Sequence, residues 1–136
     1  NVLNSAINYA KKTNSELVII HAIELPVYGF LGAGFSYVNP GQKYFKERSN
    51  AFSDYLKQFD LKGISWTVKL LLGPPAIEIS EFIKNQPFNM TIIGTASRSG
   101  ISRLILGSVA ESIVRNIDSP CLVIKEKDNF GDIIIL

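Results

Sequence analysis

Cysteine, histidine, tryptophan and methionine each occur only once in the 136-residue chain. The single cysteine, Cys121, cannot form an internal disulfide, and its place in an apolar run favours a buried thiol in a reducing compartment over a reactive one. The single histidine, His21, has no cysteine neighbours, which argues against a metal site. Because no serine, cysteine or aspartate partner for it can be identified, we expect His21 to have a core or strand-end role, not a catalytic one.

Long hydrophobic runs and a strong charge imbalance are also absent. The longest apolar runs, such as Leu17–Ala22 and Cys121–Ile124, are far shorter than the roughly 20 residues of a membrane helix. No signal peptide is visible. The formal net charge of +2 is too small to indicate nucleic acid or anionic lipid as a partner. We therefore expect a cytoplasmic protein that binds neither nucleic acid nor a membrane.

What the sequence does contain is a regular alternation of helical and strand-like segments. Continuous apolar runs predict strands that are covered on both faces. One segment with a period of two, Trp66–Leu72, predicts an edge strand. The expected order is a helix ending near 11–14, a strand at 17–22, a helix at about 43–59, a strand at 66–72, a helix from 75, a strand at 90–93, a helix from 108 and a strand at 120–124.

This alternation predicts an α/β fold with a parallel sheet and right-handed crossovers. Such sheets bind ligands outside the carboxyl ends of their strands, next to a topological switch point. The loop that follows Ile93 lies at one of these ends. The segment 25–42, rich in glycine, proline and aromatic residues, is expected to be the least ordered part of the chain interior.

The stretch Gly94–Glu111 has three features of a phosphate-binding loop. Glycines at 94, 100 and 107 allow sharp bends and close approach of a ligand. Ser108 and Glu111 have the spacing of a capping box at a helix start. A helix N-terminus offers unpaired N–H groups and the positive end of the helix dipole to an anion. The alternative, that these residues only cap the helix and shape a loop, stays open on these cues alone, and neither G-x-x-x-x-G-K-[ST] nor G-x-G-x-x-G is present.

The same stretch closely resembles the signature of the universal stress protein family. In the nucleotide-binding branch of that family the signature is similar to G-x2-G-x9-G-[ST], and this chain has Gly94, then Ser97, then Gly107-Ser108 at those positions. Ser119–Ile124 looks like the closing strand of the family. The segment from Ala10 to Glu24 looks like its first helix and second strand.

The resemblance implies a fold, a ligand and an assembly. The fold is a doubly wound, parallel, five-stranded sheet in the order 3-2-1-4-5 with helices on both faces, similar to adenine-nucleotide α-hydrolases. The implied cofactor is ATP or AMP, with Mg²⁺ accompanying ATP. The implied partner is a second copy of the chain, joined through the last strand to form a homodimer.

The resemblance also implies which residues bind the nucleotide. The phosphates would contact the loop and the helix start, the adenine would meet the backbone after the second strand, and the ribose would lie beside the fourth. The implied nucleotide-binding residues are Ala22, Ile93, Gly94, Ser97, Gly107, Ser108 and Val109. No catalytic residue and no metal-binding residue is implied.

The serine at position 97 departs from the motif of the nucleotide-binding branch. If the position requires a positive φ, a serine there costs about 1 kcal/mol or more. If the position only donates an N–H group, Ser97 can serve and can add its hydroxyl. The family also has a branch without the glycine motif that does not hold ATP, and this chain lies between the two branches.

The two ends of the chain depart from the family pattern as well. The resemblance places the first family strand before Asn1, which implies a truncated or incompletely ordered version of a longer protein. Residues 1–128 would form the family domain. The strand-like residues 129–136 would form a C-terminal extension, either as a hairpin beside the last strand or paired with another chain, or would begin a second repeat.

Three functions remain open from the sequence. The first is a stress-response or signalling module that binds an adenine nucleotide, with at most slow hydrolysis, because no general base or catalytic lysine stands out near Gly94–Ser108. The second is a dimeric interaction protein of the same family that binds no nucleotide. The third is a related ATP-pyrophosphatase-like ligase, to which the Gly94–Ser108 stretch does not belong.

Overall fold

The computed structural model describes residues 1–26, 40–96, 107–126 and 133–135. The predicted alternation of helices and strands is confirmed, with one further strand at its end. In chain order the elements are α1 (Val2–Thr13), β1 (Leu17–Ile23), α2 (Pro40–Leu56), β2 (Trp66–Leu72), α3 (Pro75–Lys84), β3 (Thr91–Ala96), α4 (Ser108–Asn116), β4 (Cys121–Glu126) and β5 (Ile133–Ile135). Most of the segment 25–42 lies outside the described residues.

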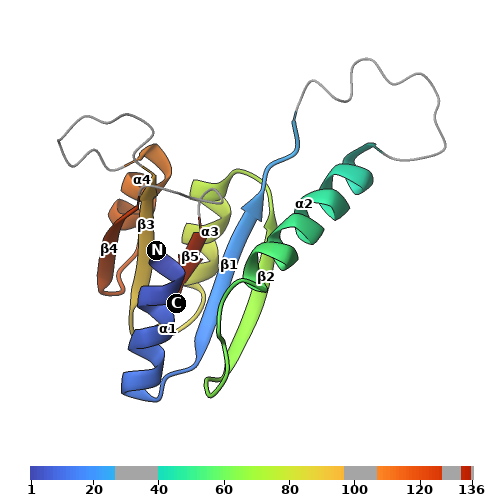
Figure 1. The fold of residues 1–136 in the computed structure, drawn as a ribbon. Helices are drawn as coiled ribbons and strands as arrows, with labels where there is room; N and C mark the ends of the chain where they lie inside the picture. Colours follow the sequence, from blue (N-terminus) through green and yellow to red (C-terminus); the bar gives the residue numbers. More distant parts are fainter. Residues whose placement is uncertain (27–39, 97–106, 127–132, 136) are drawn as a thin grey trace.

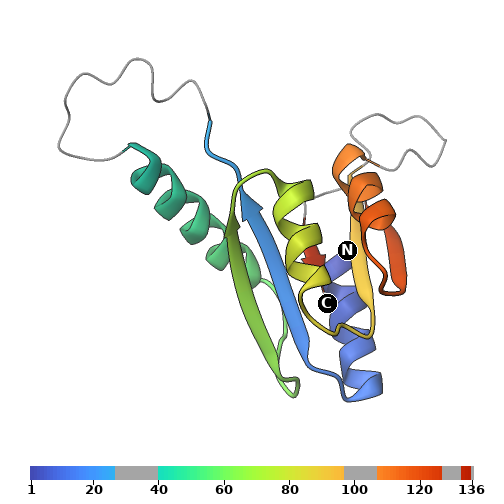
Figure 2. The same cartoon turned by 180° about the vertical axis from the view of Figure 1, so that it is seen from behind.

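The strands form one sheet in the order β2-β1-β5-β3-β4. Strands β1 and β2 pair in parallel, as do β3 and β4. Helices α1 and α2 lie on one face of the sheet and α3 and α4 on the other (Figures 1 and 2). The prediction that Trp66–Leu72 forms an edge and that β1 and β3 lie in the interior is therefore confirmed.

The centre of the sheet differs from the sequence-based expectation. Strand β5 lies between β1 and β3 and runs antiparallel to both (Figure 1). The prediction of a hairpin beside the last strand is thus wrong, and the predicted all-parallel sheet is wrong in its central strand. Because β5 is antiparallel, β4 ends and β5 begins at the same edge of the sheet. The ends of the two strands are separated by β3 alone, a distance of roughly 10 Å, and an extended chain spans about 3.3 Å per residue.

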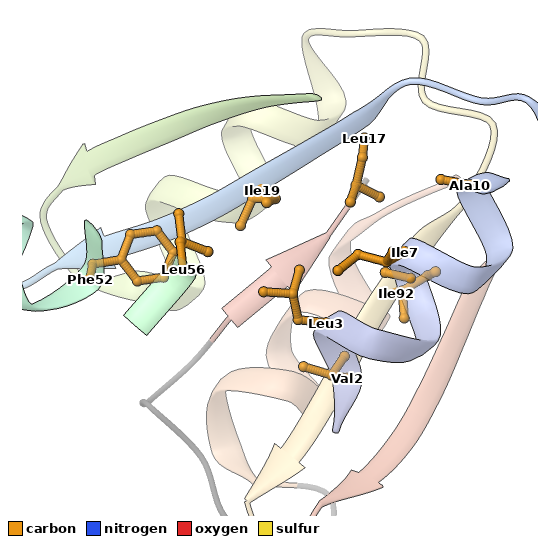
Figure 3. Close-up of a cluster of buried hydrophobic side chains, with 10 residues drawn as sticks. Val2, Leu3, Ile7, Ala10, Leu17, Ile19, Phe52, Leu56 and Ile92 are labelled. Carbon is orange, nitrogen blue, oxygen red and sulfur yellow. The ribbon is translucent and has the colours of Figure 1, made fainter. Parts of the chain in front are cut away.

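Alternation along the strands divides the core into two clusters. On one face, α1 and α2 pack against the odd-numbered residues of β1, as Figure 3 shows for Leu3, Leu17, Ile19 and Phe52. On the other face, α3 and α4 pack against its even-numbered residues, among them Ile20. The interior strands β1 and β3 are apolar on both sides for this reason.

His21 belongs to the first of these faces. Its side chain is 3% exposed, and its ring stacks on Phe52 with the ring centroids 4.7 Å apart. The expected core role of His21 near the end of its strand is confirmed.

Strand β5 is shorter than the strands on either side of it. It pairs with Ile19–His21 of β1 and with Ile92 and Ile93 of β3. Towards the amino ends of β1 and β3 a hollow of about 750 Å³ opens, lined by residues that include Leu17, Val18 and Met90. The side chains of α1, α3 and the strands do not fill the sheet centre at this end.

Cys121 begins β4 and is half-buried against the cluster beneath α3 and α4. Burial raises the pKa of its thiol, because the thiolate is desolvated there. We expect alkylation by iodoacetamide near pH 8 to be slower for folded protein than for protein in urea. Since the pKa is higher in the folded state, this group favours folding at lower pH, and its contribution is lost as the pH rises past the ordinary thiol pKa. Equal alkylation rates with and without urea would contradict this expectation.

Candidate functional site

The carboxyl ends of β1 and β3 and the N-terminus of α4 lie at the same edge of the sheet (Figure 1). This edge carries the residues that the sequence singled out, apart from Ser97, which lies outside the described residues together with the rest of 97–106. The environments of the remaining predicted residues depend on the direction of their backbone groups and on the packing of α4.

The backbone of Ala22 is directed away from β2. Leu17 N–H donates to Ser65 O at 2.9 Å, and Ile23 O accepts from Gly73 N–H at 3.1 Å. Odd-numbered residues of β1 therefore direct their backbone groups to β2, and because neighbouring residues alternate, Ala22 directs its groups to the side of β5. Its position lies one residue beyond His21, which pairs with Ile133 at the start of β5. The backbone groups of Ala22 are thus directed away from β2 at the carboxyl end of β1, one position beyond the described part of β5.

Gly94 has a different environment. Thr91 N–H donates to Pro120 O at 2.8 Å, so by alternation Gly94 directs its backbone groups to the side of β5. Ile93 pairs with Ile134, which places Gly94 level with Ile133. The backbone groups of Gly94 therefore face β5 itself. A side chain at this position would lie on the sheet face that α1 covers.

Three of the predicted residues come together beneath α4. Ala22 and Ile93 are buried in the cluster under α3 and α4, and Val109 packs against that cluster from the first turn of α4. Thr95 also lies at this end of β3 and is only 3% exposed. Sequence reasoning missed Thr95, although its position two residues after Ile93 puts it on the α4 face of the strand.

The N-terminus of α4 has no side-chain cap among the described residues. Gly107 is the N-cap residue with φ −59° and ψ 152°. The first intrahelical bond runs from Glu111 N–H to Gly107 O at 2.9 Å. A helix leaves its first N–H groups without an intrahelical acceptor. The groups of Ser108, Val109 and Ala110 therefore have no backbone acceptor within the helix, and a side chain at Gly107 would meet no atom of the described residues within 4 Å.

The predicted capping box is wrong. Ser108 is the first residue of the helix and not its cap, and its side chain is exposed. Glu111 instead pairs with Arg115, with its Oε1 at 3.0 Å from Nη2 and 3.1 Å from Nε. This pairing offsets the negative charge that Glu111 brings to the first turn.

Helix α3 begins at the same edge but is a poorer anion site. Its cap and first residue are Pro74 and Pro75, which have no N–H group to donate. Glu78 adds a carboxylate to its first turn. Of the two helix starts, α4 is the one suited to phosphate.

Comparison with known proteins decides the family. The model of the universal stress protein family matches residues 1–125. The chain belongs to the universal stress protein family. Universal stress protein MJ0531 of Methanocaldococcus jannaschii is 31% identical over 121 residues, which are 89% of this chain and 71% of that protein.

Solved structures of this kind share the fold. The universal stress protein of Archaeoglobus fulgidus is 25% identical with a TM-score of 0.59, covering 91% of this chain and 86% of that one. The M. jannaschii protein MJ0577, described as a case of structure-based assignment of biochemical function, has a TM-score of 0.65 at 21% identity, covering 94% of this chain and 90% of that one. The parallel strands that alternate with helices are common to these universal stress proteins.

In ranges 1–26, 40–96, 107–126 and 133–135, no three histidine, cysteine, aspartate or glutamate residues cluster so as to hold a metal ion. Among the helices of those same ranges, none has the length and apolar character needed to cross a membrane.

Proposed function

We propose that this universal stress protein binds an adenine nucleotide, ATP or AMP, at the carboxyl edge of its sheet and acts as a cytoplasmic stress-response or signalling module. The observation that carries the proposal is the start of α4, where three N–H groups have no intrahelical acceptor, no described side chain caps the helix, and the positive end of the helix dipole lies at Gly107. Membership in the universal stress protein family supports it.

Each residue has a role in this proposal. The N–H groups of Ser108 and Val109, at the open helix start beside Gly107, bind the phosphates. The backbone of Ala22 meets the adenine, because its groups are directed away from β2 at the carboxyl end of β1. Ile93 and Gly94 lie near the ribose, and Ser97 donates to the phosphates from the loop. Mg²⁺ accompanies ATP through the phosphates and water.

Turnover is expected to be slow at most. Glu111, the acidic residue in the first turn of α4, is paired with Arg115. A carboxylate paired with a guanidinium one helical turn away is not placed to activate an attacking water. The proposal is therefore one of binding and sensing, with ATP hydrolysis at most a slow side reaction.

A second copy of the chain is proposed to join at β4. This strand is at one edge of the sheet, and Leu122 on it is 43% exposed. Pairing across the edge would satisfy its outer backbone groups and bury that side chain. A dimeric interaction protein without nucleotide is the second candidate function, supported by this edge and by Ser97 in the motif.

Calorimetric titration of the full chain with ATP and with AMP tests the proposal. We expect binding below millimolar concentration, and Ser97→Gly should leave the affinity unchanged or increase it, because it restores the family motif. If the chain binds neither nucleotide but Ser97→Gly restores binding, Ser97 has disabled the site and the interaction protein is the better answer. If Ser97→Gly also binds neither nucleotide, the phosphate site is wrong for this protein.

A further inference from the structure

The edge of the sheet opposite β4 combines unpaired backbone with an apolar hollow. Strand β2 is the last strand on that side of the described sheet. Because Ser65 O accepts from Leu17 and Gly73 N–H donates to Ile23, odd-numbered residues of this segment face β1. Even-numbered residues of β2 therefore direct their N–H and C=O groups outwards.

The same even-numbered residues line a hollow on the α2 face. The hollow has a volume of about 660 Å³, and β2 contributes Trp66, Val68 and Leu70 to it. The opposite wall comes from the buried Phe52 and Leu56 of α2. In Figure 1, α2 lies beside β2 on this face.

Two large side chains of β2 are exposed, Trp66 at 41% and Leu72 at 54%. An exposed tryptophan beside an apolar hollow is typical of an anchor point for a partner. The backbone and side chains of β2 together have the two parts of a strand-addition site, in which main-chain bonds give affinity and alternate side chains enter pockets.

The positive charge of Lys69 indicates which kind of strand the β2 edge would bind. On the other face of β2, between Thr67 and Leu71, Lys69 is exposed, and it forms no ion pair with any other described residue. A peptide strand added to β2 places every second side chain in the hollow and the intervening ones on the Lys69 face. A second copy of β2 would bring another lysine to that face, and like charges on paired strands are unfavourable.

We propose that the β2 edge binds an extended peptide in which bulky apolar residues alternate with acidic ones. The apolar side chains fill the hollow between α2 and β2, and an acidic side chain lies beside Lys69. This site is independent of the proposed nucleotide site, because it lies along a different edge of the sheet and uses none of its residues.

Trp66 makes the test direct, because it is the only tryptophan in the chain. The probe is a blocked heptapeptide of alternating isoleucine and glutamate, titrated into the full chain. We expect the tryptophan emission to shift to shorter wavelength as the ring loses water. Amide exchange at Trp66, Val68 and Leu70 should slow at the same time, because their N–H groups face outwards.

Two further peptides separate strand addition from general adhesion. A heptapeptide with prolines at its third and fourth positions lacks an N–H group that would face β2 in either strand direction, and it should bind at least about ten-fold more weakly. A heptapeptide with lysine in place of glutamate should also bind more weakly. If the proline peptide binds as well as the original, the strand-addition site is wrong.

Charge reversal tests the choice of partner. Lys69→Glu should weaken binding of the acidic peptide about five-fold and strengthen binding of the lysine peptide. Lys12→Glu makes the same change of net charge at an exposed position on α1 and should leave both affinities unchanged. Equal effects of the two variants would overturn the role of Lys69. A shift that appears with protein concentration and no peptide would overturn the proposal in favour of a second copy.

Discussion

Gly107→Asp is expected to abolish nucleotide binding while leaving the protein at least as stable as before. Gly107 has the φ and ψ of an ordinary N-cap residue. A side chain added to it would have no atom of the described residues within 4 Å. Aspartate is a better N-cap than glycine by a few tenths of a kcal/mol. Its carboxylate would bind the same N–H groups as the phosphates and would repel them. We expect affinity for ATP to fall by about 100-fold or more, or about 2.7 kcal/mol.

The measurement is calorimetric titration with ATP together with urea denaturation of the same sample. Gln42→Asp provides the matched control, because it adds one carboxylate to the first turn of α2 at an exposed position. Gly107→Val should also lose binding, since its branched side chain would occupy the position of the phosphates. Unchanged ATP affinity in Gly107→Asp would refute phosphate binding at α4, whatever its stability.

Ile134→Pro is expected to cause a large loss of stability. Ile134 is the middle residue of β5 and pairs with Ile20 on one side and Ile93 on the other. Proline has no N–H group for the ladder and is excluded from central strands. With a backbone bond lost and its partner left buried without one, the free energy of unfolding should fall by about 2–4 kcal/mol.

Val123→Pro is the control for this variant, measured by urea denaturation in the same way. Thr91 donates to Pro120, so even-numbered residues of β4 face β3, and the N–H group of Val123 is directed outwards from the edge. Measured at protein concentrations too low for pairing between β4 edges, proline at such a position should cost about 1 kcal/mol or less. If the two variants lose equal stability, β5 does not occupy the centre of the sheet.

Several features of this protein could be predicted from its sequence because hydrophobic spacing records directly which faces of an element are covered. The continuous apolar run at Leu17–Ala22 identified an interior strand, and the period of two at Trp66–Leu72 identified an edge strand. The alternation of helices and strands then predicted the α/β fold and its parallel pairs β1–β2 and β3–β4. The region of the candidate site followed from the same order, because ligands bind at the carboxyl ends of such strands.

The start of α4 at Ser108 could be predicted from the sequence, but its cap could not. The spacing of Ser108 and Glu111 fits a capping box, but it does not say which residue leaves the helical conformation first. In the structure Gly107 has the extended ψ of a cap, and Glu111 bonds to Arg115. This choice depends on how the chain enters the helix from the sheet. It changes the site, because an uncapped glycine leaves the N–H groups of the first turn open.

The central strand shows most clearly what only the tertiary structure decided. The sequence marks Ile133–Ile135 as strand-forming, but apolar residues do not encode which strand they pair with or in which direction. Those choices depend on backbone groups of β1 and β3 that face each other across one strand width, far apart in sequence. They also depend on β4 ending at the edge where an antiparallel strand can begin. Local pattern therefore determined the elements and their faces, whereas strand order, direction and the open helix start depended on contacts between distant segments.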